Sequence, residues 1–246
     1  MLVKATNDVW VFTFIAALTS VLGGFSAMFI IRFKDGLKIH WKKYSELKIW
    51  IKDAFPFFLS TVFGTLKEQS LVIILGTFFS LKDVAIYDLA KKVISLPNII
   101  VSSINGALYP KIVVKNQSDV IKKIIWIEAL IALIIIAGVV LFGEWLVVLL
   151  GGTEMSNAYF IAIILSFTIL AHLLVGTYIY FVFIPKNKFY YVTKNQLVAM
   201  ISFFIYAFVG FLFDQSIYMF VLAMSLSGMT ELLYCYIVIK KNNMLR

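Results

Sequence analysis

Lys67 and Glu68 are adjacent charges near the middle of an apolar stretch that runs from Ala54 to Phe79. A charge at the centre of a bilayer costs at least about 2.5 kcal/mol on insertion scales, so such groups face a bundle interior or a wet cavity. Neighbours on a helix project about 100° apart and pair poorly with each other. Lys67 is suited to attracting an anionic substrate group, and Glu68 to pairing with that lysine or exchanging a proton. The competing interpretation is a structural pair whose partner helix is missing from the chain.

The next apolar segment opens with Asp88, Lys91 and Lys92. On a helix Asp88 is spaced to form a surface ion pair with either lysine. Contact between Asp88 and Lys67 is not expected. Lys67 lies ~20 Å from the outer end of its predicted helix, whereas Asp88 lies only ~6 Å from the outer end of the next predicted helix. Lys91 and Lys92 therefore either line the cavity or snorkel to the membrane surface.

Pro97 is central in this segment and is followed by several small polar residues, among them Asn98 and Asn105. Proline removes one helical hydrogen bond, and neighbouring polar groups or waters take up the freed carbonyl. We therefore expect a hinge at Pro97 and take Asn105 as a candidate cavity residue. The alternative is a static bend, with the polar side chains bonding between helices.

Three further ionisable residues fall inside later apolar segments. Glu231 lies about midway along the last one and, like Glu68, is a candidate site for a coupling ion such as a proton or sodium. Glu128 lies near the start of its segment, where it is expected to reach back to Lys122 or Lys123. His172 is interpreted as packing rather than as a ligand.

These residues must be positioned by membrane helices, because the chain is 62% hydrophobic and only 14% charged. A soluble domain carries about 25% charged residues. Spanning the bilayer takes roughly 20 residues, which predicts an all-α bundle of about seven spans. The predicted spans are Val9–Ile31, Ala54–Phe79, Val84–Tyr109, Ile121–Leu141, Ala158–Ile184, Gln196–Phe213 and Ile217–Ile239.

Most of the 22 Lys and Arg residues fall in four segments, at 32–52, 111–123, 186–194 and 240–246. The positive-inside bias places these segments and the C-terminus in the cytoplasm. The first span then starts outside after only eight residues, which suggests the C-terminal part of a longer transporter. The alternative is a complete seven-helix protein. Nothing in the pattern indicates nucleic-acid binding, since the basic residues do not form one amphipathic face.

Enzyme signatures are absent from the sequence. There is no phosphate-cradling glycine loop and no His-Glu metal helix, and the single Cys235 offers no cysteine cluster. We therefore expect a protein that is not an enzyme and that needs no cofactor and no metal.

Four motifs resemble one known family. They are Pro56–Ser60, Leu75–Ser80, Val84–Lys92 and Ala107–Lys111. Together they are similar to Wzx-type polysaccharide flippases, which belong to the polysaccharide biosynthesis proteins of the multidrug/oligosaccharidyl-lipid/polysaccharide exporter superfamily. Ala85 stands where the family usually has glycine. The downstream part resembles the same family less specifically.

The resemblance implies a two-lobe exporter of about twelve spans, of which residues 1–53 are a connecting helix and basic loop and residues 54–246 the C-terminal lobe. It also implies transfer of undecaprenyl-diphosphate-linked oligosaccharide across a bacterial inner membrane during O-antigen or capsule assembly. Membrane lipids, a polysaccharide polymerase and other assembly proteins are the implied partners. Two alternatives stay open: a drug or cation antiporter of the same superfamily, and a non-transporting partner in polysaccharide synthesis.

Overall fold

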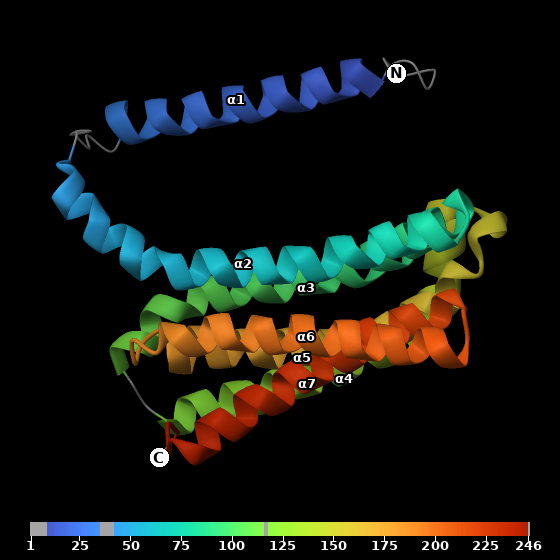
Figure 1. The fold of residues 1–246 in the computed structure, drawn as a ribbon. Helices are drawn as coiled ribbons and strands as arrows, with labels where there is room; N and C mark the ends of the chain where they lie inside the picture. Colours follow the sequence, from blue (N-terminus) through green and yellow to red (C-terminus); the bar gives the residue numbers. More distant parts are fainter. Residues whose placement is uncertain (1–8, 35–41, 116–117, 246) are drawn as a thin grey trace. The chain divides into compact units, whose positions relative to one another are not determined.

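The computed structural model describes residues 9–34, 42–115 and 118–245. Regular structure in these ranges is entirely helical, as predicted (Figure 1). The helices are α1 (Val9–Phe33), α2 (Tyr44–Phe78), α3 (Leu81–Lys115), α4 (Ser118–Gly151), α5 (Ala158–Tyr178), α6 (Phe189–Phe213) and α7 (Ile217–Lys241). A short 3₁₀ helix, η2 (Thr153–Met155), precedes α5, and a π-helical turn, η3 (Ile179–Phe183), continues it.

The contacts divide the chain into two units, Met1–Trp50 and Ile51–Arg246, with the division falling inside α2. The described part of the first unit consists mainly of α1, whose large apolar side chains are exposed along its length. Such a surface suits a lipid environment. The second unit contains the packed bundle described below.

Helix α5 is the central element of the second unit. It packs against α3, α4 and α7, while α6 packs on α7. The close approach of α5 and α7 depends on Gly228, because a Cβ atom there would lie 3.2 Å from the Cβ of Ala171. Small residues permit this kind of backbone proximity between membrane helices.

Two apolar cores stabilise the bundle at different depths. The first includes Leu75, Ile169 and Phe203. The second includes Phe183, Val192 and Cys235. Along α6 and α7 the buried polar residues Asn195 and Glu231 fall between members of the two cores. The fold therefore leaves a polar layer between two apolar ones, and this layer contains the candidate site.

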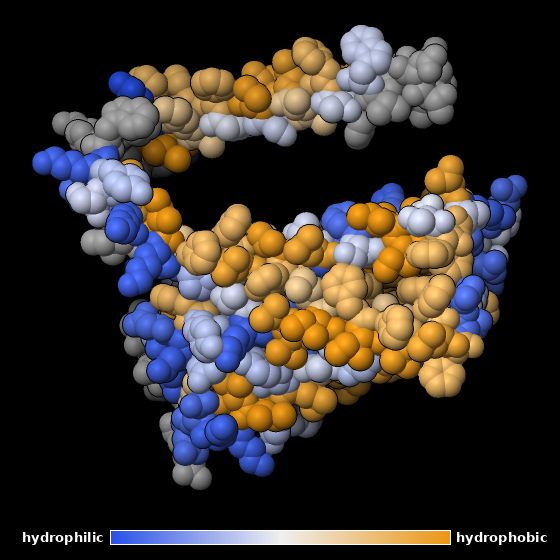
Figure 2. Space-filling view, viewed as in Figure 1, coloured by the Kyte–Doolittle hydropathy of each residue, from blue (hydrophilic) through white to orange (hydrophobic). Residues whose placement is uncertain are grey.

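The end of α3, the start of α4, the α5–α6 connection and the end of α7 lie at one end of the second unit, here called the basic end (Figure 1). Figure 2 shows hydrophilic residues at the ends of this unit and apolar residues across the face between them. This distribution is the one expected of helices that cross a bilayer.

Six helices of the described chain are long and apolar enough to cross a membrane. Helix α3, which was predicted as a seventh span, is not among them. The reason is its composition, because the charged residues at 88–92 are followed by Pro97, Asn98 and Asn105. The chain therefore has the features of a multi-pass membrane protein in which one bundle helix is distinctly polar.

Several predicted helix boundaries were too narrow. Helix α2 begins ten residues before Ala54 and α4 continues ten residues beyond Leu141. Helix α6 begins at Phe189 instead of Gln196, so Lys194, interpreted as a loop residue, is helical and lies over the Tyr190 ring at 4.5 Å from its centroid. The predicted helices stop where charged residues begin. In the structure the helices continue past these positions, because long charged side chains can extend from a continuing helix.

Candidate functional site

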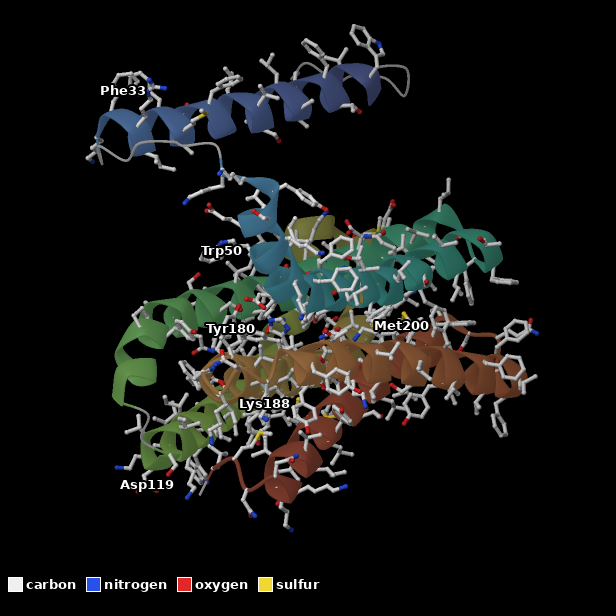
Figure 3. All side chains as sticks on the ribbon, turned by 60° about the vertical axis from the view of Figure 1, so that its left-hand side comes forward. Phe33, Trp50, Asp119, Tyr180, Lys188 and Met200 are labelled. Carbon is white, nitrogen blue, oxygen red and sulfur yellow. The ribbon has the colours of Figure 1, made fainter. Side chains whose placement is uncertain are left out.

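A cavity of about 1070 Å³ opens within the second unit, in the polar layer. Its walls come from α2, α3, α5, η3, α6 and α7. Its charged and polar lining includes Ser60, Lys67, Glu68, Lys91, Ser95, Asn98, Ser102, Asn105, His172, Gln196 and Glu231. Figure 3 draws the side chains on the ribbon and labels Tyr180, which also belongs to the lining.

Lys67 lies deep in this cavity and pairs with Glu231 of α7. The distance from Lys67 Nζ to Glu231 Oε2 is 3.8 Å, and the two residues are only 9% and 7% exposed. The partner of Lys67 is therefore within the chain, and the hypothesis that the partner helix is missing is wrong. Removing one member of such a buried pair costs about 3–5 kcal/mol, because the other charge stays buried without compensation.

Two amides hold the Glu231 carboxylate in place. Asn195 Nδ2 and Gln196 Nε2 both donate to Glu231 Oε1, at 2.7 and 2.6 Å. Gln196 is itself packed against Gly64 of α2, where a Cβ atom would lie 3.3 Å from Gln196 Oε1. Glu231, predicted as a coupling-ion site, thus has both oxygens engaged by protein groups.

Glu68 pairs with Lys91 of α3, with 2.8 Å between Lys91 Nζ and Glu68 Oε2. Glu68 lies ten residues before the end of α2 and Lys91 ten residues after the start of α3, so both are about 15 Å from the turn that joins them. This pair is less buried than the first, with side-chain exposures of 47% for Glu68 and 40% for Lys91. It is the pair that a solute in the cavity can reach.

Lys92 does not belong to the cavity lining. Its Nζ lies 2.8 Å from Asp88 Oδ2, one turn away on α3, and both side chains are more than half exposed. This is the helix-surface pair that the spacing predicts, and Lys92, also chosen as a cavity candidate, lies outside the lining. The cause is helical geometry, because neighbouring residues point about 100° apart.

The remaining predicted residues of this region do lie at the cavity. Asn105 is buried and contributes to the lining, and His172 is exposed toward it. Helix α3 continues unbroken through Pro97, and the next residue, Asn98, has a buried side-chain oxygen with no hydrogen-bond partner within the described chain. The hinge at Pro97 stays a prediction.

Glu128 differs from its predicted arrangement. It is buried, and its carboxylate accepts a hydrogen bond from Thr177 of α5. Of its two expected partners, Lys122 pairs with Asp119 instead, and Lys123 is exposed. The prediction followed only the helix that carries Glu128, whereas packing turns this side chain toward α3 and α5.

Sequence reasoning missed the amides of α6 and the contact of Thr177. Asn195 and Gln196 were placed at the edge of a predicted span, although their position between apolar stretches signals buried polar groups. Thr177 carries no such signal, because a single Thr in a membrane helix commonly bonds to its own backbone. Only packing against α4 distinguishes it.

The chemistry available here is electrostatic and hydrogen-bonding. Four charges line the cavity, and each lysine is paired with a glutamate. The cavity is therefore electrically balanced within a lining of both polar and apolar side chains, and an anion that binds a lysine competes with its glutamate. In the described residues, no group of three or more His, Cys, Asp or Glu side chains is placed to hold a metal ion.

The fold and the site together define a multi-pass α-helical membrane protein with a charged internal cavity. Residues 1–114, a little under half of the chain, match the family model of polysaccharide biosynthesis proteins. The match includes Lys67, Glu68 and Lys91 but ends before Glu231. Neither a curated protein nor a solved structure matches the chain.

Proposed function

We propose that this chain is the C-terminal portion of a flippase of the polysaccharide biosynthesis family and moves a lipid-linked oligosaccharide across the membrane. The observation that carries the proposal is the charged cavity of about 1070 Å³ inside a bundle of membrane-crossing helices. The family match over residues 1–114 supports it, since the matched part supplies Lys67, Glu68 and Lys91 to that cavity.

The substrate class proposed is a polyprenyl-diphosphate-linked oligosaccharide of the kind used for O-antigen or capsule. Its diphosphate headgroup needs a hydrated, cationic route, and its lipid tail can stay in the bilayer. Lys91 is the better docking group of the two cavity lysines, because its pair with Glu68 is partly exposed whereas Lys67 is buried against Glu231. Hydroxyl and amide side chains of the lining suit the sugar.

The chain is proposed to act in a bacterial inner membrane without catalysing a chemical reaction. Its basic end is assigned to the cytoplasm, since Lys122, Lys188 and Lys241 lie at that end. Cytoplasmic loops carry an excess of Lys and Arg. A polymerase and other assembly proteins are the proposed partners. A drug or cation antiporter is disfavoured, because both cavity glutamates are already paired with lysines.

The test replaces Lys91 by alanine in the complete protein, expressed in a strain that lacks its own flippase. We expect surface polysaccharide to fall at least about tenfold, which corresponds to a loss of about 1.4 kcal/mol. Lys82→Ala is the matched control, because Lys82 is exposed on α3 and does not line the cavity. Membrane levels are compared by immunoblot. Normal export by the Lys91→Ala protein at equal abundance would contradict the proposed role of the cavity.

A further inference from the structure

Glu128 is a second buried acid, separate from the cavity charges. It lies on α4, is 3% exposed, and faces the neighbouring helices α3 and α5. Thr177 Oγ1 donates to Glu128 Oε2, and the Asn105 side chain approaches the same carboxyl group. The other oxygen, Oε1, is buried and has no hydrogen-bond partner among the described residues. The two neighbours that interact with this carboxyl group are therefore neutral.

No described cation compensates Glu128. On its own helix, Lys122 pairs with Asp119 and Lys123 is exposed. Helices α3 and α5 pack against α4. The titratable residues nearest in sequence to Asn105 and Thr177 are Tyr109, His172 and Tyr178. None of these three has a described bond to Glu128. Because Glu128 is only 3% exposed, the surroundings of the bundle do not reach the carboxyl group either.

A carboxylate buried in this way retains an effective desolvation penalty of several kcal/mol. A neutral carboxylic acid avoids most of that penalty, and its hydroxyl adds a donor that the carboxylate lacks. We propose that Glu128 is a proton-binding site, held as a neutral acid between α3, α4 and α5. The proposal does not depend on the transported substrate and holds whether or not the chain is a flippase.

The cavity supplies the route by which this proton exchanges with water. Asn105 both lines the cavity and approaches Glu128, whereas Glu128 and Thr177 are not part of the lining. A sodium ion fits this place less well, because it needs several oxygen ligands around it and the Thr177 hydroxyl is already in direct contact with Glu128. The proton requires no such space.

The test is infrared difference spectroscopy of the complete protein in lipid bilayers, with pH as the perturbation. We expect a carbonyl absorption of a protonated carboxylic acid at neutral pH that is absent from Glu128→Gln. Glu144→Gln is the control, since Glu144 is an exposed acid on the same helix. A neutral-pH spectrum that is identical with and without Glu128→Gln would overturn the proposal. Thr177→Val provides a second readout, because loss of its hydrogen bond should shift the same absorption.

Two further arms test the route and the ion. Asn105→Leu should keep the absorption but slow its hydrogen–deuterium exchange several-fold, and unchanged exchange would overturn the route through Asn105. Sodium chloride is compared with choline chloride at constant pH. Loss of the absorption in sodium alone would mean that a metal cation displaces the proton, and would overturn the assignment of Glu128 as a site for protons. Neither arm measures polysaccharide export, so its outcome is separate from that of the proposed function.

Discussion

Lys67 and Glu68 are neighbours in the sequence but pair with residues on different helices, Glu231 of α7 and Lys91 of α3. This follows from the helical turn, which directs adjacent side chains to different sides. The two pairs also differ in burial, so they have different consequences. The Lys67–Glu231 pair joins α2 to α7 in the interior, whereas the Glu68–Lys91 pair presents charge to the cavity.

The buried pair predicts strong non-additivity in stability. Lys67→Met and Glu231→Gln should each destabilise the protein by about 3–5 kcal/mol, because each leaves the other residue buried without its partner. The double variant should lose much less than the sum of the two. Denaturant titration in detergent measures all three proteins. Lys92→Ala is the control, and its exposed pair with Asp88 should contribute no more than about 1 kcal/mol. Additive losses would show that the two residues do not interact.

At the scale of helices, the polar layer depends on how α5 is packed. This helix contacts α3, α4 and α7, and its Gly176 and His172 face the cavity while Ala171 meets Gly228 of α7. Directly after it comes a π-helical turn, η3, whose first residue, Ile179, also lines the cavity. Such turns occur often at functional sites, and composition alone does not predict them here.

The contact between Gly228 and Ala171 leads to a prediction about packing. Gly228→Val would place a Cβ atom 3.2 Å from the Ala171 Cβ and its methyl groups closer still. Overpacking of this kind costs about 1–3 kcal/mol, so the thermal midpoint of the purified protein should fall. Gly138→Val is the control, since nothing lies within 4 Å of a Cβ atom at Gly138. Equal effects of the two substitutions would argue against close packing of α5 on α7.

At the scale of the whole molecule, charge separates the two ends of the second unit. The basic end carries Lys122, Lys188 and Lys241, while Asp83, Glu154 and Asp214 belong to the opposite end. The end with more Lys and Arg faces the cytoplasm in most membrane proteins. We therefore expect the basic end of the second unit to lie on the cytoplasmic side of the membrane.

Cysteine labelling in intact cells tests the orientation directly. The only native cysteine, Cys235, is buried and should contribute little background. A membrane-impermeant thiol reagent should label Asp214→Cys, and should label Lys241→Cys only after the membrane is opened. Both positions are exposed, so accessibility to the reagent is not limited by packing. Labelling of Lys241→Cys in intact cells would reverse the proposed orientation.

The sequence by itself determined the helical class, the approximate spans and the charge that marks one end. These depend on properties local to each segment, namely the length of an apolar run and the residues that flank it. It also indicated that Lys67 and Glu68 belong inside the bundle, because their cost in lipid is independent of the fold. The surface pair of Asp88 and Lys92 was likewise predictable from spacing on one helix.

Only the tertiary structure decided which helix supplies each partner. Glu231 reaches Lys67 across 164 residues of sequence, and Thr177 reaches Glu128 from another helix. Such pairings depend on the rotation and relative depth of two packed helices, which neither segment encodes alone. The same reason explains why Lys92 turned out to face away from the cavity and Asn195 to lie within the polar layer.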